Sequence, residues 1–288
     1  MNKPLLNPIT QKQLLAYIKQ PSPHGIMLTG PSGSGKTIVA NWLAAKLLGI
    51  SIDKINSCPY FMLIEPEQKQ VLKIEEIRKI NHFLSRKVPN LNQPVNRVLL
   101  IKNAEAMSLP AQNALLKNLE EPPLNTIIIL TASDFSHILA TIRSRCIKIN
   151  ILKPSHADLL NYLINQGYDH KLIERATSVS GDLPKLSIKL LDDQSGSINT
   201  ATDTARDLLT TDRYHRLLRL NELAKDKDGF KDVLDILKRM AIVAMAKSSS
   251  ETQFDRWNRI LQLTLQSETF SKHNTNTKLN ILNLLNRL

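Results

Sequence analysis

One stretch of eight residues has the composition and spacing of a phosphate-binding loop. It consists of Gly30, Pro31, Ser32, Gly33, Ser34, Gly35, Lys36 and Thr37. In such a loop the glycines allow backbone N–H groups to close around phosphates, and the positive amino end of the next helix adds to the attraction. Lys36 would contact the outer phosphates, and the Thr37 hydroxyl would bind a nucleotide-held Mg²⁺. The pattern therefore predicts an ATP site.

A second strand should supply the acids that hold Mg²⁺ and activate water, and here those acids are missing. The apolar segment 98–101 is followed by Lys102 and Asn103, and the first carboxylate is Glu105 in the next turn. An ammonium group about 4 Å from Mg²⁺ costs on the order of 8 kcal/mol at an effective dielectric constant of about 20. We therefore expect Lys102 to turn away or to disfavour the metal, and we expect ATP binding with little or no hydrolysis. The alternative is that another acid takes this role.

The elements that position these residues alternate between strand and helix. Apolar strands are expected at 25–29, 60–64, 98–101, 126–131 and 147–151, and helices at 36–48, 74–84 and 110–121, with a loop at 51–58. Continuous apolar strands separated by helices are typical of a parallel sheet that is covered on both faces. Residues 1–152 are therefore predicted to form an α/β nucleotide-binding core.

The remainder of the chain is predicted to be helical. Three short helices at 156–166, 171–178 and 184–191 would form a small lid over residues 153–195, and the polar segment 192–200 would be a linker. Residues 200–288 contain no proline, and their apolar residues recur at helical spacing. We predict an all-α domain of four or five helices there.

Composition narrows the class of protein further. The 288 residues carry a formal net charge of +12, and residues 1–150 hold 18 basic and 9 acidic side chains, a net charge of +9. This excess favours contact with a polyanion such as DNA, although it would also serve solubility alone. Two cysteines exclude a disulfide scaffold, and neither a membrane span nor a signal peptide is evident. A cytoplasmic protein without membrane contact is expected.

Two further motifs give the chain a family resemblance. The string at 111–123 has the sequence AQNALLKNLEEPP, and Ser144-Arg145-Cys146 follows about twenty residues later. With the phosphate loop, this order resembles the clamp-loader branch of the AAA+ ATPases, as found in bacterial DNA polymerase III. The resemblance implies an AAA+ core, a helical lid and a helical collar. It also implies hetero-oligomeric assembly with gamma/tau motor subunits and a delta subunit, which together load a sliding clamp onto primer-template DNA.

The resemblance also implies roles for individual residues. Arg145 matches an arginine finger that acts in trans on the ATP of a neighbouring subunit, whereas the residues alone would favour an exposed ion pair. Ser133 matches a nucleotide sensor, and Lys185 lies where the family often has a second, arginine sensor. The chain would act as a stator with little ATPase activity of its own.

Departures from the family leave two alternatives. The family often carries a four-cysteine zinc module after the phosphate-loop helix, but residues 49–59 are too few and contain only Cys58, so no zinc is expected. A catalytically active motor subunit of the same branch would need an acid in place of Lys102 or Asn103. A P-loop kinase for a small substrate would explain neither the Arg145 motif nor the helical C-terminal third.

Overall fold

The computed structural model divides into two compact units, Met1–Ser155 and His156–Leu288. The residues that it describes are 4–22, 24–66, 72, 74–86, 88, 94–133, 135–192, 197–272 and 276–288. Segments 153–195 and 200–288, predicted as separate lid and collar, both fall in the second unit apart from residues 153–155. The finer division into lid and collar stays a prediction.

The first unit is built on a five-stranded sheet whose strands are all parallel. Their order across the sheet is β2-β3-β4-β1-β5. The strands are β1 (Gly25–Thr29), β2 (Phe61–Ile64), β3 (Arg97–Ile101), β4 (Thr126–Ala132) and β5 (Cys146–Asn150). Each lies within a residue or so of its predicted position. The central strands β1, β3 and β4 are buried throughout, which explains their uninterrupted apolar sequences.

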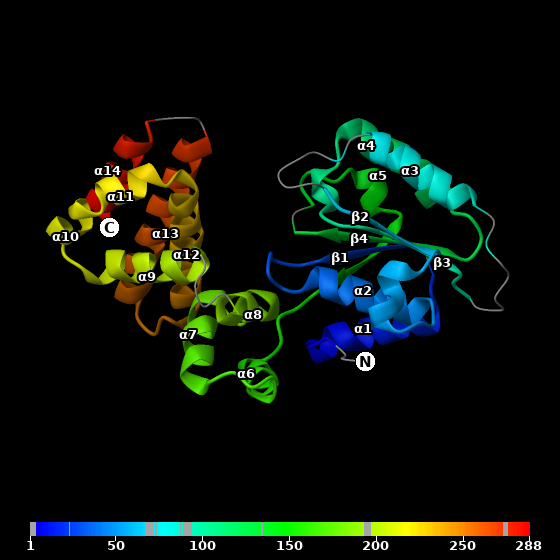
Figure 1. Ribbon diagram of the computed structural model, residues 1–288, viewed down its shortest axis with the longest axis horizontal. Helices are drawn as coiled ribbons and strands as arrows, with labels where there is room; N and C mark the ends of the chain where they lie inside the picture. The colour runs from blue at the N-terminus through cyan, green and yellow to red at the C-terminus, as the bar shows by residue number, and fades with distance from the viewer. Residues whose placement is uncertain are drawn as a thin grey trace. The chain divides into compact units, whose positions relative to one another are not determined.

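Helices cover both faces of this sheet (Figure 1). α1 (Pro8–Lys19) and α2 (Lys36–Leu47) pack on one face, and α3 (Ile74–Ser85), α4 (Leu109–Glu120) and α5 (Ala140–Arg143) lie on the other. Alternate residues of β1 supply the two cores: Ile26 and Leu28 face α1 and α2, whereas Met27 faces α4 and α5. The parallel α/β core predicted from the sequence is confirmed.

Four elements of the first unit differ from the prediction, and α5 is one of them, because no helix was expected at 140–143. The expected loop at 51–58 contains the 3₁₀ helix η1 (Ile52–Ser57), and a second short 3₁₀ helix, η2 (Ala104–Ala106), follows β3. α1 was not predicted, although Asn7 caps it by accepting a hydrogen bond from the Ile9 N–H and proline occupies its first turn. Buried Thr10 ties α1 to the chain that leaves β5, because its hydroxyl donates to the Asn150 carbonyl and accepts from the Leu152 N–H.

The second unit is helical throughout its described residues. Its helices are α6 (His156–Asn165), α7 (His170–Ser180), α8 (Pro184–Asp192), α9 (Ser197–Thr210), α10 (Arg213–Leu218), α11 (Leu220–Lys225), α12 (Lys227–Lys247), α13 (Glu251–Lys272) and α14 (Thr277–Arg287). α12 and α13 pack side by side, and α12 also packs against α7 and α9 (Figure 1). None of the described helices is long and apolar enough to span a membrane.

Two predictions for the second unit were wrong in detail. Segment 200–288 contains helices from α9 to α14, six in its described part rather than four or five. The missed boundaries are marked by Asp212 and Asp226, whose carboxylates cap α10 and α12. The expected linker 192–200 is helical at both ends, and its middle residues 193–196 lie outside the described part of the chain.

Candidate nucleotide site and arginine finger

The phosphate loop follows β1 and leads directly into α2, as predicted. Gly30, Gly33 and Gly35 have φ angles of 150°, 89° and 86°, which side chains disfavour. At Gly30 a β-carbon would also lie 2.9 Å from the carbonyl oxygen of Ile151. These glycines therefore let the backbone turn tightly at the amino end of α2, which is where a phosphate binds most readily.

The polar side chains of the loop point to a phosphate as its ligand. Lys36 is 7% exposed, and its ammonium group donates to the carbonyls of Gly30 at 2.8 Å and Pro31 at 2.9 Å. The Ser34 hydroxyl is buried and has no hydrogen-bond partner among the described residues. Thr37 is half-buried, whereas Pro31 and Ser32 are exposed. A buried cation and an unpaired buried hydroxyl beside a glycine turn fit the phosphates of ATP.

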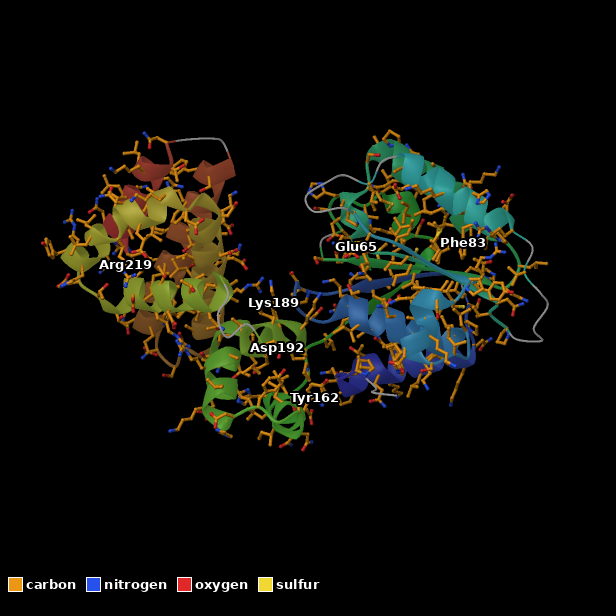
Figure 2. All side chains as sticks on the ribbon, viewed as in Figure 1. Glu65, Phe83, Tyr162, Lys189, Asp192 and Arg219 are labelled. Carbon is orange, nitrogen blue, oxygen red and sulfur yellow. The ribbon has the colours of Figure 1, made fainter. Side chains whose placement is uncertain are left out.

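The end of β3, where a metal-binding acid was sought, carries an ion pair instead. Lys102 lies 2.7 Å from the carboxylate of Glu65. Glu65 follows β2 and is labelled in Figure 2. Because β2 and β1 lie on opposite sides of β3, Lys102 turns away from the phosphate loop. The Asn103 N–H donates to the Thr131 hydroxyl at 3.1 Å. Positions 102 and 103 therefore offer a cation and a neutral amide, and neither supplies the carboxylate that was sought for Mg²⁺.

The predicted sensor Ser133 lies next to the phosphate loop. It follows Ala132, which pairs with Thr29 at the end of β1. Its N–H donates to the Glu105 carboxylate at 2.9 Å, and the second carboxylate oxygen of Glu105 is buried without a partner among the described residues. No local pattern signals this contact, because the two residues are 28 positions apart.

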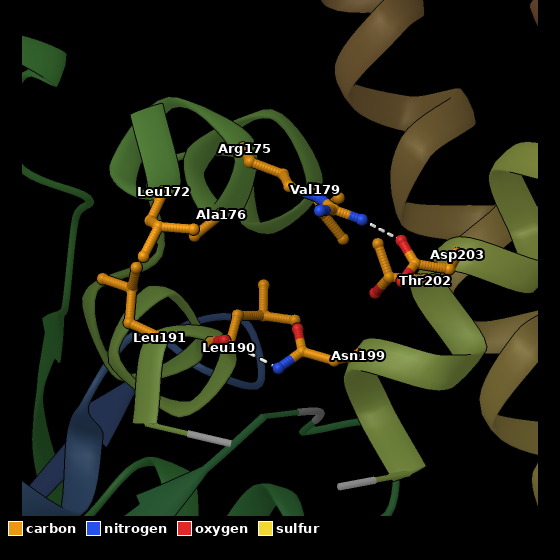
Figure 3. A pocket seen from close by; sticks show the side chains of 9 residues that line it. All are labelled: Leu172, Arg175, Ala176, Val179, Leu190, Leu191, Asn199, Thr202 and Asp203. Atoms are coloured by element: carbon orange, nitrogen blue, oxygen red, sulfur yellow. Dashed lines mark hydrogen bonds and ion pairs between the residues drawn. The ribbon is translucent and has the colours of Figure 1, made fainter. Parts of the chain in front are cut away.

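The other predicted sensor, Lys185, belongs to the second unit and is exposed on α8. A cavity of about 340 Å³ lies beside α8, between α7 and α9, but Lys185 does not line it. Arg175 of α7 and Asp203 of α9 form an ion pair across this cavity, whose other wall is mostly leucine (Figure 3). The pair connects the predicted lid with the predicted collar.

Arg145 lies at the opposite edge of the sheet from the phosphate loop. It immediately precedes Cys146, which pairs with Gly25 at the start of β1, whereas the loop begins after Thr29 at the end of β1. At about 3.3 Å per residue the two edges are roughly 16 Å apart. Arg145 therefore cannot contact a nucleotide held by the loop of its own chain.

The Arg145 guanidinium is held by two helices of the first unit. One nitrogen lies 2.7 Å from the Glu120 carboxylate at the end of α4, and the other donates to the Thr141 carbonyl of α5 at 2.9 Å. The Arg145 side chain is 36% exposed, so solvent and a neighbouring molecule can reach it. The structure thus joins the two diagnostic motifs, because Glu120 belongs to the string at 111–123.

Comparison with known proteins shows the family to which the chain belongs. Residues 7–155, just over half of the sequence, match the family model described as DNA polymerase III, delta subunit. The chain belongs to this family. The DNA polymerase III subunit delta′ of Pseudomonas aeruginosa is 30% identical over 184 residues, which cover 58% of this chain and 55% of that protein. The delta′ subunit of Haemophilus influenzae is 26% identical over 246 residues, covering 81% and 73%.

A solved structure confirms the fold of this family member. The DNA polymerase III gamma subunit-related protein of Thermotoga maritima superimposes with a TM-score of 0.56 at 20% sequence identity, over 96% of this chain and 97% of that one. The resemblance to clamp-loader subunits and the AAA+ fold class predicted from the motifs are therefore both confirmed. The match to the Pseudomonas relative spans about half of that protein's length.

Both cysteines of this family member are free thiols in the structure. Cys58 and Cys146 are free, and burial raises the pKa of Cys146 to about 12. In the described part of the chain, no group of three or more His, Cys, Asp or Glu residues is placed to hold a metal ion. The expectation of no zinc rests on the short segment 49–59, whose one cysteine is Cys58, and it stays a prediction.

Proposed function

We propose that this clamp-loader subunit is a delta′-like stator that supplies Arg145 to the ATP site of a neighbouring motor subunit. The observation that carries the proposal is the position of Arg145, exposed at the sheet edge opposite its own phosphate loop. A guanidinium placed there can stabilise a transferring phosphoryl group only on another chain. Its planar fork and permanent charge suit that role.

The chain's own loop is proposed to bind ATP without appreciable hydrolysis. Lys36 would exchange the two loop carbonyls for phosphate oxygens, and Ser34 and the backbone of Gly33–Gly35 would donate to them. Thr37 is the residue that could bind a nucleotide-held Mg²⁺. Bound ATP would supply negative charge that orders the loop. For hydrolysis, Lys102 and Asn103 provide no general base that could take a proton from the attacking water. Ser133 and Lys185 are the proposed sensors.

The partners follow from the same proposal. Gamma/tau motor subunits and a delta subunit would complete the assembly, which opens the sliding clamp and places it on primer-template DNA in the cytoplasm. The excess of basic residues in the first 150 positions supports contact with a polyanion. The helices α9–α14 would form the collar that holds the subunits together.

The test compares the native chain with Arg145→Ala in a clamp loader reconstituted with its cognate subunits, clamp and primed DNA. An arginine finger contributes about 10³-fold or more to the turnover of its site. We expect ATP hydrolysis at the neighbouring site to fall by about that factor, while the isolated chain hydrolyses no ATP. Arg143→Ala, an exposed arginine two residues away, is the control. Unchanged turnover in Arg145→Ala would contradict the proposal.

A second candidate function is that of a motor ATPase of the same branch. The observation that favours it is the unpaired, buried carboxylate oxygen of Glu105 beside Ser133. That carboxylate would have to replace the missing acids of β3. Mg²⁺-dependent ATP hydrolysis by the isolated chain, abolished in Glu105→Gln, would establish this function and overturn the stator proposal.

A further inference from the structure

The contacts of Arg145 identify a residue that acts through it. Glu120 stands in the last turn of α4, where the negative end of the helix dipole disfavours an acid and attracts a cation. Glu121 follows directly as the C-cap, so two carboxylates and a helix terminus concentrate negative charge at this point. The Arg145 guanidinium lies against it, 2.7 Å from Glu120.

The geometry leaves the guanidinium able to bind a second anion. Glu120 contacts one terminal nitrogen, and Thr141 and Ser144 accept from the other at 2.9 and 3.4 Å. A guanidinium has five N–H donors. Among the described residues no contact uses the Nε–H or the second N–H of the nitrogen that faces Glu120. Those two donors remain for phosphate oxygens.

We propose that Glu120 is a positioning residue, which holds Arg145 in one rotamer at the sheet edge so that its remaining donors meet a neighbour's nucleotide. This inference rests on the proposed function of Arg145. An arginine side chain has many rotamers, and fixing one of them costs conformational entropy. If Glu120 fixes the rotamer before assembly, that cost no longer adds to the barrier for phosphoryl transfer. Glu120 lies on the same chain as Arg145 and contacts only one nitrogen of the guanidinium. Its role is therefore to orient the Arg145 side chain and leave other donors for the nucleotide.

The chain supplies its own matched control. Glu121 is adjacent, carries the same charge and is exposed, and it takes part in none of the ion pairs found among the described residues. Glu120→Ala and Glu121→Ala remove the same charge from the same helix terminus. Only the first removes the contact with Arg145. Glu120→Gln removes the charge but keeps an acceptor oxygen.

The experiment measures clamp- and DNA-stimulated ATP turnover in the reconstituted loader. We expect Glu120→Ala to lower kcat about fivefold with an unchanged KM for ATP, since a half-exposed pair of this kind has a modest energy. Glu120→Gln should recover most of the loss, and Glu121→Ala should match the native chain. In the Arg145→Ala background, Glu120→Ala should have no further effect. Melting temperature and assembly, measured by size-exclusion chromatography, should stay unchanged.

The possible failures are distinguishable. If Arg145→Ala lowers turnover but Glu120→Ala equals Glu121→Ala, the positioning role is wrong while the stator function stands. If Glu120→Ala raises turnover, the carboxylate sequesters the finger instead of orienting it, and the inference is overturned. An equal loss in the Arg145→Ala background would show a structural role. If Arg145→Ala has no effect, the proposed function and this inference fail together.

Discussion

The two edges of the parallel sheet present positive charge in different ways. At the carboxyl edge, Lys36 is buried and enclosed by backbone, and three glycines with positive φ shape the loop around it. At the amino edge, Arg145 is half-exposed and held by a side chain and a carbonyl from two helices. The first arrangement depends on local sequence, whereas the second depends on contacts between separate elements.

This difference teaches how each site can be changed. A loop made of backbone tolerates few substitutions, because any added side chain strains it or fills it. An arginine held by an exposed ion pair can lose that pair and still carry its charge, so mutation changes its orientation more easily than its charge. We therefore expect single mutations in the loop at the carboxyl edge to abolish its binding. Mutations of the residues that hold Arg145 at the amino edge should reduce its function only gradually.

After Arg145→Ala, the largest effect in this comparison should come from Lys36→Ala. It removes the buried ammonium group that would contact phosphate, and a hydrogen bond to a charged group contributes up to about 3 kcal/mol, or about a hundredfold in affinity. Titration with a fluorescent ATP analogue would measure this loss. Lys46→Ala, exposed on the same helix, should bind normally. Equal affinity of the two variants would show that the loop does not bind phosphate through Lys36.

The Cys146 thiol tests how strongly the surrounding residues shield the start of β5 at the amino edge, where Cys146 is half-buried. Burial raises its pKa from 9.0 to about 12, so the reactive thiolate is about a thousandfold rarer near pH 8. Greater intrinsic nucleophilicity offsets part of this, leaving alkylation about fiftyfold slower than for an ordinary thiol. A Cys58→Ser variant leaves Cys146 as the one thiol to be followed with iodoacetamide. Rapid alkylation under native conditions would contradict this shielding.

The same thiol predicts a pH dependence of stability. The unfolded thiol ionises near pH 9 and the folded one near pH 12, so this group lowers the free energy of unfolding as the pH rises across that interval. Below pH 9 both states hold the proton and the effect is absent. Denaturant titrations of the native chain and Cys146→Ala at pH 8 and 10 would show the difference, with the decline smaller in the variant.

The smallest of these four effects should be the difference between two glycines of the loop. An alanine at Gly30 would face a φ of 150° and a carbonyl oxygen 2.9 Å from its β-carbon, and we expect it to lower the free energy of unfolding by about 2 kcal/mol. At Gly35 the β-carbon would meet nothing within 4 Å, so only the φ of 86° opposes it, at about 1 kcal/mol. Chemical denaturation would measure both, and a costlier Gly35→Ala would contradict this account.

The sequence predicted the carboxyl edge far better than the amino edge. The loop and its flanking elements are contiguous, and a buried parallel strand has an unmistakable apolar run. The contact between Glu120 and Arg145 joins residues of separate elements, and an exposed ion pair leaves no periodic signal. Glu105 beside Ser133 was missed for the same reason. The sequence predicts that Lys185 lies on a helix, but it does not predict which elements that helix contacts.

Helix boundaries were the other weak point. Between residues 200 and 288 the apolar spacing continues across short breaks, so periodicity alone merged α10 and α11 with their neighbours. The caps at Asp212 and Asp226 would have separated them. Asn7 and Pro8 are likewise the signals for the start of α1, and the search for apolar spacing did not use them.

The strand order also governs when the phosphate loop can form during synthesis. β1 pairs only with β4 and β5 within the sheet, and its partner Cys146 emerges about 120 residues after Gly25. At roughly 5–20 residues per second, a ribosome needs about 6–24 s to supply that partner. Thr10 must wait longer, because its partners Asn150 and Leu152 are 140 and 142 residues away. The segment translated first is thus among the last to be completed, and until then its apolar strand lacks its sheet partner β5.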